Sequence, residues 1–464
     1  LIGSICSLYL KLKIEGGAGV RPHKNSINNY YYPENPEAGI DLFLEKLVQE
    51  TEKEHEDILE QADETDAVFG ELYSWYLRNP EYRSRVQKLV QSAFAGKPKD
   101  IISQSVAKAL YGEVSPYSAT RLERFAACAF AHFLQYGMKL TERVEYEFKP
   151  MDMGNVMHEA LESFAEEVRK RGMKWTELTE QERNEIADRC LDNIVADYGN
   201  TVLKSSARNE YMIERTRRIL RRTVWALQKQ LEQGEFQPEG FEVTFGGGRI
   251  DRVDIMEDQN KVYVKVIDYK TGNTSFDLVY LYHGLQLQLM IYLDGALRVE
   301  QKKYPDKEII PAGVFYYNIK DPMIQEKIDA DVEAVSAGLM KELKMNGLVQ
   351  ADPELVYRMD SSLGSIPVAF NKDGSFRKNS SVADRTQFAV LGRYVRTKIE
   401  KIRSSILEGD AEVSPYELGK KNACTYCPYM TVCGFDRRLS GYEFRRLKNF
   451  SDEELWKAFD REAE

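Results

Sequence analysis

Residues 261–270 read KVYVKVIDYK, and Thr271 and Gly272 follow them. Side chains alternate between the two faces of a β-strand. One face of this stretch therefore carries, in order, Val262, Val264, Val266, Asp268 and Lys270. That face is apolar for three positions and then ends in a carboxylate and an ammonium group. The pattern predicts a strand of a buried sheet, with a charged site where the strand ends.

A second strand is predicted over GRIDRVDIM, residues 248–256. On it, Asp251 shares a face with the apolar Val253, whereas Asp254 faces the other way. Two carboxylates that converge in a partly dry place repel each other, and each favours protonation. A divalent cation between Asp251 and Asp268 would remove that conflict. Hard oxygen ligands suit Mg²⁺ or Mn²⁺.

Such an ion lowers the pKa of a bound water and neutralises charge on a phosphodiester. Lys270 is suited to orient or deprotonate that water and to stabilise the pentacovalent phosphate. We therefore expect a metal-dependent hydrolytic site at the mouth of the sheet. The alternative is that Asp268 and Lys270 form a surface ion pair beside the turn that follows them.

Two predicted helices carry further polar groups. In GNVMH, residues 154–158, His158 lies over the turn that contains Gly154, where a missing side chain leaves space for a metal or a phosphate. In QLMIY, residues 288–292, Gln288 and Tyr292 share one helix face. They are suited to contact phosphate and to support the lysine. The alternatives are a structural histidine and two polar residues at the edge of a core.

The hydrophobic period changes to two from residue 241 onward. A helix at about 281–298 and a strand at 312–319 follow the two strands, and this order predicts a small α/β unit. The sequence is mainly helical before residue 241 and after residue 325. SDEELWKAF, residues 451–459, has the Ser-x-x-Glu signature of a helix start and predicts a short terminal helix.

The chain resembles the RecB family of nucleases, within the PD-(D/E)xK superfamily. The resemblance rests on four motifs that occur in the same order: Gly154-x-x-x-His158, Gly248-Arg249-Ile250-Asp251, Asp268-Tyr269-Lys270 and Gln288-Leu289-x-x-Tyr292. Ile250 replaces the proline that usually precedes the first acid. The resemblance implies an α/β fold with a restriction-endonuclease-like core, in which helices flank a central mixed sheet, and large helical additions.

The same resemblance implies roles for individual residues. His158, Asp251 and Asp268 would hold the metal, with the carbonyl of Tyr269 as a further ligand. The catalytic residues would be Asp251, Asp268 and Lys270. The expected enzyme is a Mg²⁺-dependent deoxyribonuclease that acts as an exonuclease.

Three of the six cysteines stand close together in CTYCPYMTVC, residues 424–433. They are Cys424, Cys427 and Cys433. Thiolates this close can share one centre, and Cys128 is the best candidate for a fourth ligand. Four thiolates fit a [4Fe–4S] cluster or a tetrahedral Zn²⁺. The alternative is chance clustering of buried thiols. For Cys6 and Cys190, which lie far from the others in the sequence, we expect ordinary buried thiols.

The spacing of one cysteine followed by three resembles the iron–sulfur clasp of AddB-type nucleases. This resemblance covers residues 113–434 and implies a [4Fe–4S] cluster. It also implies a heterodimer with an AddA-like helicase–nuclease subunit that processes double-strand breaks for recombination. The substrate would be single-stranded DNA from unwound duplex, and the strand cut would be the one that ends 5′. The clasp would close a loop of roughly 300 residues and so restrict the unfolded chain.

The 464 residues carry a net charge of −10, which argues against a generally basic nucleic-acid binder but leaves room for a local groove. No run of about 18 apolar residues occurs, so no membrane span is expected, and we expect a cytoplasmic protein. No GxxxxGK[ST] phosphate loop occurs either. Because the first residue is not Met, we expect a piece of a larger protein.

Three segments are predicted. Residues 1–112 would be the helical remainder of a helicase-like region, residues 113–434 the nuclease domain with its four-cysteine clasp, and residues 435–464 a helical tail. Two alternatives to this function stay open. One is a non-catalytic DNA-binding or scaffold subunit that keeps the nuclease fold, and the other is a stand-alone exonuclease.

Overall fold

The computed structural model describes residues 74–94, 101–112, 118–141, 150–197, 206–246, 248–324, 331–438 and 441–463. Most of the predicted helical segment 1–112 lies outside these ranges, and so does Cys6. Within the described ranges, no helix is long and apolar enough to cross a membrane.

The chain divides into two compact units. The sheet unit comprises Val114–Ala126, Thr141–Ser404 and Asn449–Glu464. The cysteine unit comprises Leu1–Glu113, Ala127–Leu140 and Ser405–Lys448. The three predicted segments, 1–112, 113–434 and 435–464, remain a prediction.

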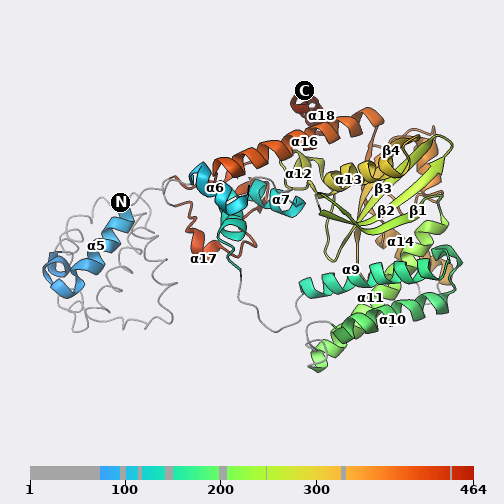
Figure 1. Cartoon of the computed structure of the whole chain (residues 1–464), viewed down its shortest axis with the longest axis horizontal. Coiled ribbons are helices and arrows are strands. Elements are labelled where there is room, and N and C mark those ends of the chain that lie inside the picture. The colour runs from blue at the N-terminus through green and yellow to red at the C-terminus, as the bar shows by residue number, and fades with distance from the viewer. Residues whose placement is uncertain are drawn as a thin grey trace. The chain divides into compact units, whose positions relative to one another are not determined.

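Six strands form the sheet of the sheet unit, in the order β1-β2-β3-β4-β5-β6 (Figure 1). Their bounds are β1 Gln237–Phe245, β2 Gly248–Asp258, β3 Lys261–Lys270, β4 Glu308–Asn318, β5 Asn346–Gln350 and β6 Val382–Ala383. The first three strands pair antiparallel, β4 runs parallel to β3, β5 is antiparallel to β4, and β6 is parallel to β5. The prediction of a central mixed sheet flanked by helices is confirmed.

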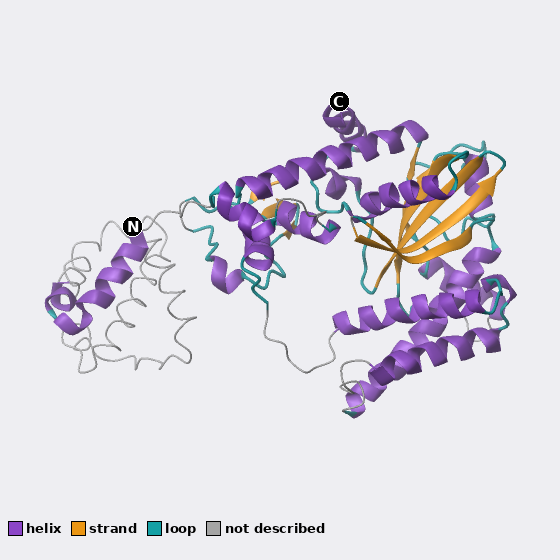
Figure 2. Cartoon of the chain, viewed as in Figure 1, coloured by secondary structure: helices purple, strands orange, loops and turns teal. Residues whose placement is uncertain are grey.

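Helices lie on both sides of this sheet (Figure 2). On one side, α9 (Pro150–Lys170), α10 (Glu180–Asp197) and α11 (Ala207–Glu232) share a core with the β3 residues Tyr263, Ile267 and Tyr269. On the other, α13 (Gln288–Lys303) packs against β2, β3 and β4. The valines of β3 are fully buried. Because helices cover both faces of β3, all of its residues between Lys261 and Asp268 are apolar or aromatic except Lys265.

The remaining helices of this unit are shorter or more peripheral. They are α7 (Ala119–Ala127), the 3₁₀-helix Trp175–Glu177, α12 (Leu278–Tyr282), α14 (Val332–Glu342), α15 (Pro353–Met359), α16 (Arg385–Glu408) and α18 (Asp452–Ala463). The last residues of α7 and α16 belong to the cysteine unit. The predicted terminal helix corresponds to α18, and Glu454 accepts the backbone N–H of Ser451 as its capping signature requires.

The prediction of one continuous helix at about 281–298 is wrong, because the chain forms two helices there, α12 and α13. Gly284 has a φ of 78°, a conformation that favours glycine. The N–H of Leu285 returns to the carbonyl of Tyr280, which closes the end of α12. The break allows the chain to restart as α13, so the residues Gln286 and Leu287 stand at a helix N-terminus.

The cysteine unit is built from short elements. They are α5 (Pro80–Phe94), α6 (Gln104–Tyr111), α8 (Ala129–His132), the π-helix Phe133–Gly137, β7 (Tyr416–Leu418), β8 (Lys421–Asn422), α17 (Met430–Cys433) and β9 (Arg445–Arg446). The strands form a small sheet in the order β8-β7-β9. Cys128 separates α7 from α8 and has an extended backbone, with φ −165° and ψ 118°.

Candidate active site

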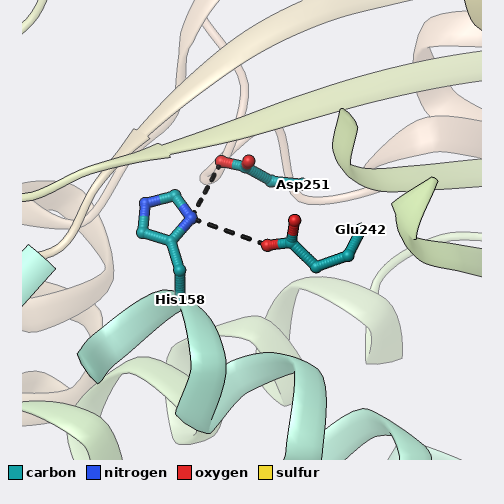
Figure 3. A group of neighbouring side chains, drawn as sticks. All are labelled: His158, Glu242 and Asp251. Atoms are coloured by element: carbon teal, nitrogen blue, oxygen red, sulfur yellow. Dashed lines mark ion pairs between the residues drawn. The ribbon is translucent and has the colours of Figure 1, made fainter. Parts of the chain in front are cut away.

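Side chains from α9, β1 and β2 meet beside the sheet (Figure 3). Nδ1 of His158 lies 3.4 Å from Oδ2 of Asp251 and 3.8 Å from Oε1 of Glu242. The imidazole points from its helix toward both carboxylates. Ligand atoms of the three residues all lie within 4.8 Å of one another. One cation could therefore touch all three.

Asp251 is fixed by the neighbouring strand. Its Oδ2 accepts the backbone N–H of Tyr269 at 2.7 Å. Tyr269 belongs to the end of β3, so the bond brings the acid of β2 to the place where the charged residues of β3 begin. The Tyr269 ring itself is buried on the α9 side of the sheet, 6.0 Å from the ring of Tyr317.

Glu242 is an acid that the sequence analysis missed. It lies between Phe241 and Val243 of β1, and these pair with the two neighbours of Asp251 on β2. Counting pairs backward from the run of three glycines in the sequence between the two strands would have placed Glu242 opposite Asp251. The signal was therefore present in the spacing of the hairpin.

The backbone of Glu242 is unusual. Its φ of 49° lies in the left-handed region, which is uncommon for a residue with a side chain. Its side chain is only 6% exposed, and its second oxygen forms an ion pair with the guanidinium of Arg249. A carboxylate held at a strained backbone position beside another acid is the kind of feature that collects at functional sites.

The charge balance of this group favours a cation. Burial alone would lower the pKa of His158, but hydrogen bonds to Asp251 and Glu242 and the charges of Asp251 and Asp268 outweigh it and raise the pKa to about 10. Without a metal, the imidazolium itself supplies the positive charge between the two carboxylates. An imidazole nitrogen with carboxylate oxygens is a donor set that suits a divalent metal.

Asp268 is buried at the end of β3, with 1% of its surface exposed. Burial, and next the charge of Asp251, raise the pKa of Asp268 to about 7. Nζ of Lys270 lies 2.6 Å from its Oδ2, which is an ion-pair distance without hydrogen-bond geometry. A buried carboxylate oxygen without a well-aligned donor is a ready ligand for a metal.

Lys270 is held from the α13 side. Its Nζ donates to Oε1 of Gln288 at 2.8 Å, and Nε2 of Gln288 donates to the hydroxyl of Tyr292 at 2.9 Å. Burial raises the pKa of Tyr292 to about 12, so its phenol stays neutral. The ring of Tyr316 lies under the ammonium group, 5.4 Å from Nζ. The structure thus gathers the motif residues from four separate elements around one place.

Gly154 lies beside Thr271, the residue after β3. A Cβ at this position would come 3.4 Å from Oγ1 of Thr271, which is ordinary van der Waals contact. Packing against Thr271 therefore does not require a glycine here, and the space that it leaves for a metal or a phosphate stays a prediction.

Asp254 belongs to a separate buried network on the other face of β2, as its alternation with Asp251 predicted. It is completely buried and forms ion pairs with Arg252 at 2.5 Å and Lys265 at 3.0 Å. Strand β2 thus carries one acid of the site, Asp251, and one acid of a structural ion network, Asp254.

Four cysteines of the cysteine unit line a single small cavity. They are Cys128, Cys424, Cys427 and Cys433. Burial, and then the three neighbouring sulfurs, raise the pKa of Cys424 to about 12. None of these four cysteines forms a disulfide. Cys190 is buried on α10, within the core of the sheet unit, as predicted.

The comparisons with known proteins agree with one another. The sequence profile of the PD-(D/E)XK nuclease superfamily matches residues 116–434. The B subunit of an ATP-dependent helicase/deoxyribonuclease from Lachnoclostridium phytofermentans is 41% identical over 425 residues, which cover 86% of this chain and 36% of that protein. Proteins of the same name from Thermoanaerobacter sp. strain X514 and Alkaliphilus metalliredigens are each 34% identical, over 86% of this chain and 37% of theirs.

The chain therefore spans a little more than a third of the length of these relatives. The matched segment contains the residues of the site and all four clustered cysteines. Taken with the mixed sheet and its flanking helices, this match means that the chain belongs to the PD-(D/E)XK nuclease superfamily.

Proposed function

We propose that this chain is the metal-dependent nuclease region of a helicase–nuclease subunit and that it hydrolyses phosphodiester bonds of single-stranded DNA. The observation that carries the proposal is the convergence of His158, Asp251 and Asp268 with Lys270. The relatives' name describes one subunit of a helicase/deoxyribonuclease, which supports DNA as the substrate and a second subunit as the partner.

The donor set supports a divalent metal. His158 and Asp251 would hold Mg²⁺ or Mn²⁺, and Glu242, whose carboxylate lies within 4.8 Å of their ligand atoms, is positioned to add a further oxygen. Asp268 and the carbonyl of Tyr269 are added to this set by the family resemblance. When bound, the ion supplies an activated water and neutralises charge on the scissile phosphate. The protein's own share is to keep these oxygens close together, which the hydrogen bond from Tyr269 to Asp251 does.

Lys270 would act directly on the substrate. Asp268 and Gln288 hold its ammonium group in place, so its remaining protons can face a phosphate oxygen or the attacking water. Gln288 and Tyr292 would support that lysine and line the path of the DNA. Each of these groups is in place before the substrate arrives, which avoids the cost of reorganisation during the reaction.

A [4Fe–4S] cluster is the group we propose for Cys128, Cys424, Cys427 and Cys433. The four thiols that line one cavity come from two distant parts of the sequence, Cys128 and the segment 424–433. Four thiolates fit a [4Fe–4S] cluster or a tetrahedral zinc. The one-plus-three spacing, which resembles the iron–sulfur clasp of AddB-type nucleases, favours the cluster.

The finer assignment rests on family resemblance. In it, the nuclease is an exonuclease that cuts the 5′-ended strand during resection of double-strand breaks, in a cytoplasmic heterodimer with an AddA-like subunit. The name of the relatives supports the helicase–nuclease setting. The pair of Lys270 and Asp268 supports the hydrolytic chemistry.

The test is digestion of end-labelled single-stranded DNA by the full-length protein, with and without Mg²⁺. Lys270→Ala should abolish cutting and keep DNA binding. Lys307→Ala, which removes a lysine paired with Glu257 elsewhere in the same unit, serves as the control and should cut like the wild type.

Each other outcome has a clear meaning. Equal cutting by Lys270→Ala and wild type would remove the catalytic role of the lysine. Cutting that persists after chelation would show that the reaction does not need a metal. DNA binding without any cutting by the wild type would support the alternative of a non-catalytic scaffold.

A further inference from the structure

Helix α13 starts without a cap of its own. Its N-cap residue is Leu287, whose backbone is already helical and whose side chain offers no acceptor. The first amides of a helix have no partner within the helix and need an acceptor from elsewhere. The break at Gly284 therefore leaves the N-terminus of α13 dependent on another part of the chain.

Glu123 supplies that acceptor. This residue lies on α7, and its Oε1 accepts the N–H of Leu287 at 2.7 Å and the N–H of Gln288 at 2.9 Å. A carboxylate at this position also interacts favourably with the positive end of the helix dipole. Two amides on one oxygen fix both the position and the direction of the first turn of α13.

Gln288 links this cap to the site. Its backbone N–H is bound by Glu123, and its side-chain Oε1 accepts from Nζ of Lys270 at 2.8 Å. A continuous path of hydrogen bonds therefore runs from α7 through one residue of α13 to the lysine. A shift of the first turn of α13 would move the acceptor that holds the lysine.

The charge environment agrees with this geometry. Burial raises the pKa of Glu123 to about 7, while the two backbone N–H groups and then Lys270 act in the opposite direction. Asp268 also contributes to this shift. Glu123 therefore lies within electrostatic range of both ends of the ion pair in the site, although it belongs to none of the four sequence motifs.

We propose that Glu123 is a positioning residue of the nuclease: through the first turn of α13 it sets Gln288, and through Gln288 it sets Lys270. The inference rests on the proposed function, because Lys270 has to be catalytic for its position to matter. Glu123, which precedes all four sequence motifs in the chain, then joins the residues on which the rate depends. The effect should fall on the chemical step and leave DNA binding unchanged.

Asp277 provides a matched control in the same unit. It caps the neighbouring helix α12 in the same way, by accepting the N–H groups of Val279 at 2.8 Å and Tyr280 at 3.4 Å. Replacing either acid by alanine removes a two-amide cap and should lower the thermal unfolding midpoint by a similar amount. Only the cap of α13 leads to Lys270.

The experiment compares Glu123→Ala, Glu123→Gln and Asp277→Ala in the full-length protein, with wild type and Lys270→Ala alongside. We expect Glu123→Ala to lower kcat roughly 10- to 100-fold, because a displacement near 1 Å at a reacting group has an effect of that size. KM for single-stranded DNA should stay nearly constant. Glu123→Gln keeps an acceptor oxygen and should restore most of kcat.

Three outcomes would overturn the inference. One is a wild-type kcat in Glu123→Ala. Another is an equal loss of kcat in Glu123→Ala and Asp277→Ala at equal loss of thermal stability, which would mean a merely structural cap. The third is a loss confined to KM. Failure of the proposed function looks different, because then Lys270→Ala would cut like the wild type.

Discussion

Nδ1 of His158 on α9 and Oδ2 of Asp251 on β2 lie 3.4 Å apart, and Glu242 completes the group from β1. In the metal-free protein a proton on the imidazole balances the two carboxylates, which is why the pKa of His158 rises to about 10. A metal and this proton cannot both occupy the site. Metal binding should therefore be coupled to proton release.

The first prediction concerns that coupling. Between about pH 7 and pH 9, His158 is protonated in the metal-free protein, so the affinity for Mg²⁺ should rise as the pH rises, by up to about tenfold per unit. Calorimetry in two buffers of different ionisation enthalpy would measure the protons released. His158→Ala should release fewer. Metal binding without any proton release in the wild type would contradict the assignment.

A second prediction concerns stability without metal. The pKa of Asp268 is raised from 3.8 to about 7, so the folded protein holds a proton that the unfolded chain loses. The stability from this proton is fully present below about pH 4 and is lost as the pH rises through about 7. Across that window the free energy of unfolding should fall by up to about 4 kcal/mol from this group.

Asp268→Asn removes this titration. In chelator, its stability advantage over the wild type should grow from low pH to neutral pH, as measured by urea unfolding. Addition of Mg²⁺ should then stabilise the wild type more than the variant. An advantage that shrinks with rising pH would show that Asp268 is ionised and paired in the folded protein throughout.

The third prediction separates the two acids of β2. Asp254→Ala leaves Arg252 and Lys265 buried without their partner and should cost about 3–5 kcal/mol of stability. Asp251→Ala removes a proposed metal ligand and should abolish cutting. It relieves the repulsion of Asp268 but leaves the N–H of Tyr269 without its acceptor, so its loss of stability should be smaller, about 1–3 kcal/mol. Thermal unfolding and the nuclease assay measure the two effects. A reversal of the two phenotypes would mean that the faces of β2 were assigned wrongly.

The parts of the site that local patterns predicted are those with a regular period. Alternation along β2 and β3 is enough to place Asp251, Asp268 and Lys270 on the same faces as the apolar residues of their strands, because successive side chains of a strand point to opposite faces. The helical period of α9 is enough to place His158 beside Gly154. Whether those elements meet was left to the family resemblance.

Two residues, Glu242 and Glu123, were not predicted, because their positions depend on interruptions of the regular strand and helix periods. Glu242 adopts a positive φ in a strand that also has an irregular register near Pro238, so simple alternation does not give its direction. Glu123 caps a helix whose start depends on the break at Gly284, and periodicity ran straight across that break. A contact between distant segments decides the role of Glu123, whereas Glu242 could have been placed by counting pairs across the β1–β2 hairpin.

The last prediction concerns the four cysteines that line one cavity. If they hold a [4Fe–4S] cluster, the protein purified without oxygen should be brown and carry about four iron atoms per chain. Cys427→Ser should lose the colour and the iron. It should also become more sensitive to proteases, because a clip between residue 128 and segment 424–433 restricts the unfolded chain.

The control is Cys190→Ser, which changes a buried thiol of the sheet unit and should keep the full iron content. Metal analysis of both variants beside the wild type decides the point: a colourless protein with one zinc ion per chain would contradict the cluster and indicate a tetrahedral zinc site.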